Sequence, residues 1–184
     1  QTAAVIDYGI AELPRHDGTE RGIENALGSA LAKLLSTLYS TSYRRKNAGN
    51  VHLSAVWIDH GWKTHIVTRV CELFRNRGFA NTYSCKGWSS DYYNGGAGKN
   101  VVARGNNVDF RERDGIRFAG QNSDYWKETT QRAFTAVPLT PGSLSLYGSI
   151  QTAHIDYASQ ITSEVLTDRA LSQRGAEIYR WTLR

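Results

Sequence analysis

The sequence contains no methionine, two cysteines and three prolines among its 184 residues. Cys71 and Cys85 have neither CxxC spacing nor nearby histidines, which argues against a structural zinc site. No apolar run approaches the roughly 20 residues of a membrane span, and the sequence does not open with a signal peptide. We therefore expect a soluble, cytoplasmic protein that has no membrane partner and keeps two reduced, buried thiols.

The composition is that of an ordinary globular protein, with 40% hydrophobic, 11% aromatic and 21% charged residues. A chain of this length predicts a single domain over residues 1–184 with its own core. The formal net charge of +5 points to a polyanionic partner such as nucleic acid, although a protein with one basic face also fits. Because methionine is absent and Gln1 opens inside a predicted strand, we expect a truncated part of a longer protein.

The most informative stretch is Val51–Trp62, an apolar run that ends at Asp59-His60-Gly61. Apolar residues at helical spacing follow over Lys63–Asn76, so the stretch predicts a strand, a tight turn and a helix. A run that is apolar on both faces is typical of a central strand covered on each side. Open α/β sheets bind ligands outside the carboxyl ends of their strands, where Asp59 falls. Asp59 either has a metal-binding or catalytic role or only turns the chain and caps the helix.

Periodicity and turn residues predict the remaining elements. Strands are expected over residues 2–10, 80–88, 144–147 and 177–184, helices over 23–38, 124–137 and 154–166, a flexible loop over 89–98 and a hairpin excursion over 99–120. Asp124 is the expected cap of its helix. The helix between the strands that end near Asp59 and Lys86 predicts that they are parallel, which would place both residues at one sheet edge.

Several cations are candidate phosphate contacts. They are Arg44 and Arg45 in a polar loop, Lys86 at a strand end, and Arg104, Arg111, Arg113 and Arg117 in the hairpin. Each also fits a solvated surface, and neighbouring acids dilute the charge of the hairpin. Asp156, two residues after His154, is a further candidate metal ligand, although helix N-termini favour aspartate in any case.

Short segments with characteristic order and spacing are distributed over nearly the whole chain. They are VIDYG at 5–9, AVWIDHGW at 55–62, VCELFR at 70–75, KGW at 86–88, SDYWK at 123–127, GSLSLYG at 142–148 and HIDYASQITSE at 154–164. In these segments the chain resembles the nuclease domain of the large terminase subunit of tailed phages, in its GpA-like branch.

The resemblance implies an RNase H-like fold, an α/β architecture with a mixed sheet flanked by helices and the hairpin as an insertion. It maps Val5–Gly9 to the third strand and Ala55–Gly61 to the fourth, so Asp59 is expected to be the second active-site acid. The first and last acids of the family would lie outside this sequence. Either those outer segments supply them, which we favour, or Asp156, His154 or Glu164 substitutes.

The implied activity is that of a divalent-metal-dependent endonuclease that cuts concatemeric double-stranded DNA during phage DNA packaging. Such hydrolysis uses two Mg²⁺ or Mn²⁺ ions about 4 Å apart, which three or four acids normally share. Asp59 alone cannot hold the pair, so we predict weak cleavage by this chain. The implied setting is the host cytoplasm, with DNA as substrate, the portal and the small terminase subunit as partners of the parent protein, and an ATPase domain upstream.

Two other interpretations remain open. The first is a non-catalytic or degenerate DNA-binding or docking domain of prophage origin. The second is a different RNase H-like enzyme, such as a resolvase or a transposase, because a fold by itself does not specify its function.

Overall fold

Helices and strands are interspersed along the chain, and both parallel and antiparallel strand pairs are present. The protein therefore has the mixed α/β class that its hydrophobic pattern predicts. The computed structural model describes residues 3–45, 49–96, 107–113, 115–148, 150–171 and 177–184. The chain divides into two compact units: unit 1 comprises residues 1–9, 88–109 and 121–184, and unit 2 comprises residues 10–87 and 110–120.

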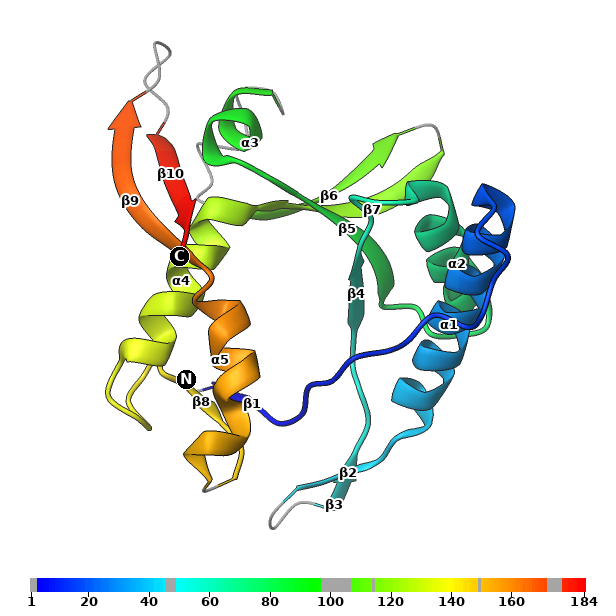
Figure 1. Cartoon of the computed structure of the whole chain (residues 1–184), viewed down its shortest axis with the longest axis horizontal. Coiled ribbons are helices and arrows are strands. Elements are labelled where there is room, and N and C mark those ends of the chain that lie inside the picture. Colours follow the sequence, from blue (N-terminus) through cyan, green and yellow to red (C-terminus); the bar gives the residue numbers. More distant parts are fainter. Residues whose placement is uncertain (1–2, 46–48, 97–106, 114, 149, 172–176) are drawn as a thin grey trace. The chain divides into compact units, whose positions relative to one another are not determined.

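Unit 2 is built on a sheet whose strand order, among the described residues, is β4-β5-β7-β6. Its elements are α1 (Glu20–Ser40), β2 (Tyr43–Arg45), β3 (Gly49–Val51), β4 (Val56–Asp59), α2 (Thr64–Asn76) and most of β5 (Thr82–Trp88), β6 (Val108–Arg113) and β7 (Ile116–Asn122). β4 and β5 are parallel, as predicted from the helix between them. Figure 1 shows α1 and α2 lying side by side.

The core of unit 2 forms between these two helices and the sheet. Leu35 of α1 and Val70 and Phe74 of α2 are buried, and Val56 and Ile58 of β4 pack against them. Apolar residues at steps of three and four give each helix the stripe that makes this contact. Burial of each large apolar side chain contributes roughly 1.5–3 kcal/mol, so these contacts fix the position of β4 against the helices.

The prediction that β4 is a central strand covered on both faces was wrong. β4 stands at the edge of its sheet among the described residues, and Trp57 is 41% exposed. Side chains alternate between the faces of a strand, so Val56 and Ile58 point to the core while Trp57 and Asp59 point to the opposite face. The sequence did not reveal this alternation, because tryptophan counts as an apolar residue whether its side chain is exposed or buried.

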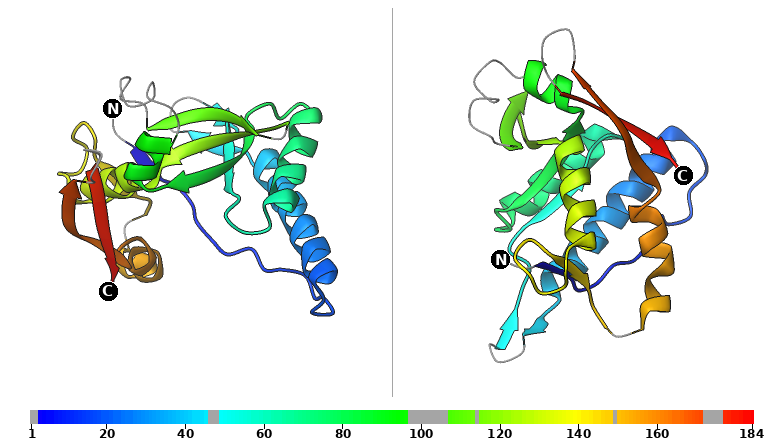
Figure 2. Two further views of the ribbon diagram at one scale, coloured as in Figure 1. Left: turned by 90° about the horizontal axis from the view of Figure 1, so that it is seen from above. Right: turned by 90° about the vertical axis from the view of Figure 1, so that its left-hand side faces the viewer.

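Unit 1 combines short helices with paired strands. Its elements are β1 (Ala3–Val5), α3 (Ser90–Gly96), α4 (Ser123–Thr135), β8 (Leu144–Leu146), the 3₁₀ helix η2 (Gln151–His154), α5 (Ile155–Ile161), β9 (Glu164–Leu171) and β10 (Glu177–Leu183). β9 and β10 form the antiparallel pair seen side by side in Figures 1 and 2. β1 is shorter than predicted and pairs in parallel with β8, whereas the resemblance maps this part of the chain to the sheet that contains β4.

Asp124 does not cap α4 as predicted. The N-cap is Asn122, whose side-chain oxygen accepts a hydrogen bond from the backbone N–H of Tyr125. Asp124 is buried in the first turn, where its carboxylate accepts hydrogen bonds from the Ser90 backbone N–H at 2.7 Å and from the Trp181 indole N–H at 2.8 Å. The carboxylate therefore joins α4 to the start of α3 and to β10.

Two further predictions of elements were wrong. The expected flexible loop contains α3, in which the Tyr93 side chain is fully buried. The helix expected over residues 154–166 ends at Ile161, and Glu164 begins β9 instead of ending that helix. In both segments tertiary contacts override local propensity: burial of Tyr93 holds α3, and pairing with β10 makes residues 164–171 a strand.

Among the described residues, no helix combines the length and the apolar composition needed to cross a bilayer.

Candidate nucleic-acid interface

Asp59 ends β4 and has an exposed side chain. Its Oδ2 accepts a hydrogen bond from the Gly61 backbone N–H at 3.1 Å, which closes the turn after the strand. The turn role proposed for Asp59 is therefore confirmed, but the capping role is wrong. α2 begins at Thr64, and its N-cap is Lys63, which makes no side-chain cap hydrogen bond.

The neighbours of Asp59 come from the parallel strand β5. Asp59 lies opposite Cys85 in the strand register, and the His60 backbone N–H donates to the Cys85 carbonyl at 2.9 Å. Burial raises the pKa of the Cys85 thiol to about 11, and the charge of Asp59 adds to the increase. Lys86, the next residue of β5, is exposed. The predicted parallel pairing of the strands that carry Asp59 and Lys86 is confirmed, although β5 continues past Lys86 to Trp88.

His60 is a buried residue at this edge. It is 4% exposed, and its ring lies 5.2 Å from the ring of Phe118 in β7. Burial lowers the pKa of the His60 imidazole, the nearby Lys86 charge lowers it further, and Asp59 acts in the opposite direction. Within the described part of the chain, the His60 Nδ1 and Ser84 Oγ atoms have no hydrogen-bond partner.

A two-metal centre requires several carboxylates, and the described residues do not assemble one. No group of three or more histidine, cysteine, aspartate or glutamate residues is placed to hold a metal ion in the described ranges. Asp59 already uses one carboxylate oxygen in its turn, and the thiol of Cys85 stays protonated. The residues present near Asp59 therefore do not by themselves fit a pair of Mg²⁺ or Mn²⁺ ions.

The proposed substitute ligands lie in unit 1, where most are engaged in other contacts. The His154 ring nitrogens contact the Tyr8 hydroxyl at 2.9 Å and the Tyr147 carbonyl oxygen at 2.7 Å. Glu164 lies 2.5 Å from the ammonium group of Lys127. Asp156 is exposed in the first turn of α5. His154 therefore has a packing role, and Glu164 has an ion-pair role.

The candidate phosphate contacts are spread over several elements. Arg44 is exposed in β2, Arg113 and Arg117 are exposed in β6 and β7, and Arg111 of β6 is half-buried. The backbone of Arg45 belongs to β2, but its side chain and the whole of Arg104 lie outside the described residues. Arg117 places its guanidinium 5.2 Å from the centre of the Phe110 ring, which is a cation–π contact.

Aromatic residues on the face of the sheet opposite the helices were not predicted as a site. Trp57 and Tyr83 are partners in the β4–β5 register, and the Phe110 ring lies 6.4 Å from Trp57 and 4.8 Å from Tyr83. We call Trp57, Tyr83, Phe110 and Arg117 the aromatic face. The i, i+2 spacing of Trp57 and Asp59 was the available signal, because that spacing puts both side chains on one face of β4.

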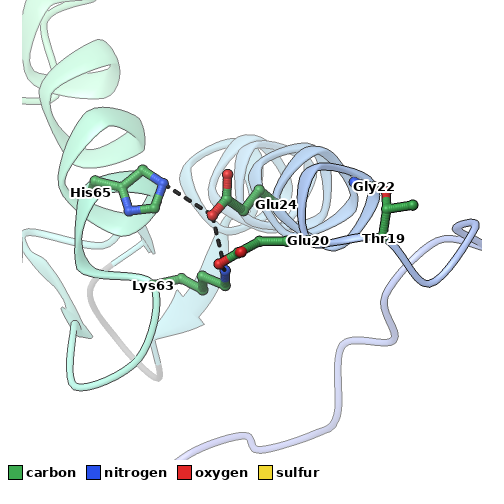
Figure 3. A network of polar contacts seen from close by, with 6 residues as sticks. All are labelled: Thr19, Glu20, Gly22, Glu24, Lys63 and His65. Atoms are coloured by element: carbon green, nitrogen blue, oxygen red, sulfur yellow. Dashed lines mark hydrogen bonds and ion pairs between the residues drawn. The ribbon is translucent and has the colours of Figure 1, made fainter.

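A charged cluster at the start of α2 was also missed. The Lys63 ammonium lies 2.5 Å from Glu20 and 2.9 Å from Glu24 of α1, and His65 lies 3.3 Å from Glu24 (Figure 3). The hydrogen bonds that Lys63 donates to Glu20 and Glu24 raise the pKa of Lys63, and the bond accepted by Glu24 lowers the pKa of Glu24. The cluster ties the two helices together and is a structural contact.

Unit 1 contains a separate, mainly apolar pocket of about 280 Å³. Its apolar lining comes from α4, β8, α5 and β9, through Phe134, Leu146, Tyr157, Ile161 and Val165. The pocket contains none of the candidate DNA-binding cations.

Comparisons with protein-family models, curated proteins and solved structures found no significant match.

Proposed function

We propose that unit 2 binds DNA and that the chain is a terminase-type nuclease domain with an RNase H-like fold. The observation that carries the proposal is the pair of exposed residues at the ends of the parallel strands β4 and β5. There Asp59 ends β4, Lys86 follows the register partner of Asp59 in β5, and the charges of both act on His60. Ligands bind at such edges in α/β proteins, and a carboxylate and a cation at one edge suit a metal ligand and a phosphate contact.

The role of Asp59 in this proposal is that of one metal ligand among several. Divalent Mg²⁺ or Mn²⁺ supplies the activation of water and the stabilisation of the leaving oxygen when it is bound. Asp59 would bind the metal through Oδ1, because Oδ2 accepts the hydrogen bond of the turn. Lys86 contacts a phosphate of the DNA backbone. Cleavage then requires carboxylates beyond those that the described residues bring together. In the parent packaging protein, double-stranded DNA is the substrate and the portal and small terminase subunit are the partners.

The test is plasmid nicking with Mg²⁺ or Mn²⁺ by the protein and its Asp59→Asn variant. Asn keeps the size of the side chain and one oxygen but removes the charge. We expect a loss of at least about 100-fold in metal-dependent nicking, with duplex affinity unchanged or higher, because the role of the carboxylate lies in the chemical step. Glu12→Gln, a change at another exposed carboxylate, is the matched control. Nicking by Asp59→Asn at the wild-type rate would refute the assigned role.

A second candidate is a DNA-binding or docking domain without catalysis. One specific observation favours it: an Asp59 oxygen accepts a hydrogen bond from the Gly61 N–H, and the described ranges hold no group of three or more His, Cys, Asp or Glu residues that could bind a metal ion. Duplex binding that weakens with salt but ignores divalent metal, together with no nicking by the wild-type protein, would select this function. Asp156→Asn in the same assay decides whether the carboxylate of unit 1 contributes.

A further inference from the structure

The aromatic face has a defined position relative to the core of unit 2. Val56 and Ile58 pack against the buried cluster that contains Leu35 and Phe74, so Trp57 between them projects from the opposite face of β4. The parallel register brings Tyr83 beside Trp57, and Phe110 contacts both rings. Three aromatic side chains from three strands therefore meet on the face of the sheet opposite Val56 and Ile58.

Two of these rings are exposed to solvent. Trp57 is 41% exposed and Phe110 is 48% exposed, and Tyr83 is half-buried between its neighbours. Single exposed apolar residues are common on protein surfaces, whereas contiguous exposed rings are typical of a binding surface. The contacts among the rings keep them in place, so a ligand that stacks on them loses little side-chain freedom on binding.

The charges around the rings favour a ligand with aromatic groups and negative charge. The exposed Arg117 guanidinium lies over the Phe110 ring, where it can also pair with a phosphate. Arg75 lies 5.6 Å from the Tyr83 ring, but it donates to the Thr82 carbonyl and thus belongs to the framework. Aromatic rings beside an arginine are the combination that binds the bases and backbone of unpaired nucleic acid.

Asp59 belongs to the same face of β4 as Trp57. The two residues are i and i+2 in one strand, which separates them by about 7 Å along the strand, a length of about two stacked nucleotide steps. A strand whose bases stack on Trp57 and Phe110 can thus extend along β4 to the exposed carboxylate. Duplex DNA cannot use the rings in this way, because its bases are stacked on one another.

We propose that the aromatic face binds an unpaired segment of nucleic acid by stacking its bases on Trp57, Tyr83 and Phe110, and that this segment leads to Asp59. This inference rests on the proposed function, because it requires that unit 2 binds DNA. It adds that the DNA at Asp59 is locally single-stranded. A second copy of the chain and an acidic peptide are the competing occupants of the face, and the experiment separates them.

The experiment measures fluorescence anisotropy of labelled oligo(dT), of a matched oligonucleotide that lacks bases, and of a duplex. Each is titrated with the wild-type protein and with the Trp57→Ala, Phe110→Ala and Trp57→Phe variants. Loss of one stacked base contact predicts at least a roughly fivefold weaker binding of oligo(dT) by each alanine variant. Trp57→Phe retains most of the affinity because it keeps a ring, and duplex binding changes less than about twofold. Tyr125→Ala removes an exposed ring of unit 1 and is the control.

Each outcome decides a different point. Equal affinity of the wild-type protein for oligo(dT) and for the base-free oligonucleotide overturns the stacking proposal, as does wild-type affinity in both alanine variants. Duplex binding that persists in that case leaves the proposed function intact, whereas failure to bind either DNA overturns both.

Sedimentation that shows a wild-type dimer and monomeric alanine variants, without any effect on oligo(dT), identifies a second copy as the occupant. Binding of an acidic peptide in place of oligo(dT), lost in the alanine variants, also overturns the proposal. If an alanine variant fails to fold, Arg117→Gln takes its place, with weaker oligo(dT) binding expected.

Discussion

His60 is a buried titratable side chain directly after Asp59, and its protonation is coupled to the folding of unit 2. Burial lowers the pKa of His60 below its ordinary value of 6.5, and Lys86 acts in the same direction. The folded state therefore favours the neutral imidazole that packs on Phe118. As the pH falls below 6.5, the unfolded chain takes up a proton at His60 before the folded chain does. The free energy of unfolding therefore decreases as the pH falls from 6.5 to the lower pKa of His60 in the folded state.

We predict that His60→Phe reduces the dependence of stability on pH. Phenylalanine fills the same volume beside Phe118 but cannot bind a proton. In urea unfolding at about pH 7.5 and about pH 5.5, the wild-type midpoint should fall more than that of the variant. His52→Gln changes an exposed histidine of the same unit and should leave the wild-type pH dependence in place. Identical pH dependence in wild type and His60→Phe would contradict the assignment.

The two cysteines are residues of the core and not of a reactive site. Both are buried and free, as their sequence context predicts. Burial raises the pKa of each thiol to about 11, so the nucleophilic thiolate is scarce at neutral pH.

At the scale of elements, the contact between α1 and the start of α2 depends on one unusual residue. Lys63 adopts a left-handed backbone conformation with φ 49° and ψ 47°, which costs energy for any residue other than glycine. The conformation directs its ammonium group to Glu20 and Glu24, as Figure 3 shows. The ion pairs and the backbone strain therefore oppose each other at a single position.

Two substitutions separate these effects. Lys63→Ala removes the ion pairs but keeps the strain, so we expect a lower urea midpoint than that of the wild-type protein. Lys63→Gly also removes the ion pairs but relieves the strain, and it should be more stable than Lys63→Ala by about 1 kcal/mol. The difference between wild type and Lys63→Gly should shrink at high salt because ions screen the pairs. Equal stability of the two variants would show that the left-handed backbone carries no strain.

Elements with strong apolar periodicity agreed with the sequence prediction, and so did the strands β5, β8 and β10, whereas α3 and the start of β9 did not. The leucine-rich stripe predicted α1, and the residues after Lys63 predicted α2. By contrast, α3 has tyrosine, asparagine and glycine in a stretch that is typical of a loop. Nothing local indicates that Tyr93 is buried there, so the sequence could not predict this helix.

At the scale of the whole molecule, each unit has its own buried contacts between segments that are far apart in sequence. In unit 1, Asp124 of α4 links Ser90 at the start of α3 to Trp181 of β10. The partners of its two carboxylate oxygens are both N–H donors. A buried acceptor with two such donors is well satisfied, and its removal leaves both donors without a partner.

We predict that Asp124→Ala destabilises unit 1 by about 2–4 kcal/mol, because two hydrogen bonds to a charged group are lost. Asp124→Asn should cost less, since its remaining oxygen can still accept one hydrogen bond. Hydrogen exchange at the backbone amide of Ser90 reports the loss directly. Asp156→Asn, at an exposed carboxylate of the same unit, should change stability by no more than about 0.5 kcal/mol. Unchanged protection of Ser90 in Asp124→Ala would contradict the proposed link.

The candidate site was predictable in part. The sequence placed Asp59 and Lys86 at neighbouring strand ends, because a strand, helix and strand in succession imply parallel pairing. The resemblance led us to expect that the other acids lie outside this sequence. The sequence could not decide whether Asp156, His154 or Glu164 would approach Asp59 instead, since carboxylates gather through the fold and not through spacing. The aromatic face was missed because Phe110 comes from a distant strand.

The sequence by itself determined the mixed α/β class, the principal helices and the parallel pairing of the strands that carry Asp59 and Lys86. Periodicity and turn residues are local, so they can be recognised without knowledge of the fold. Only the tertiary structure decided that β4 is an edge strand, that Asp124 is a buried link and that three rings meet beside Arg117. Those features depend on strand order and on contacts between distant residues, which no local pattern encodes.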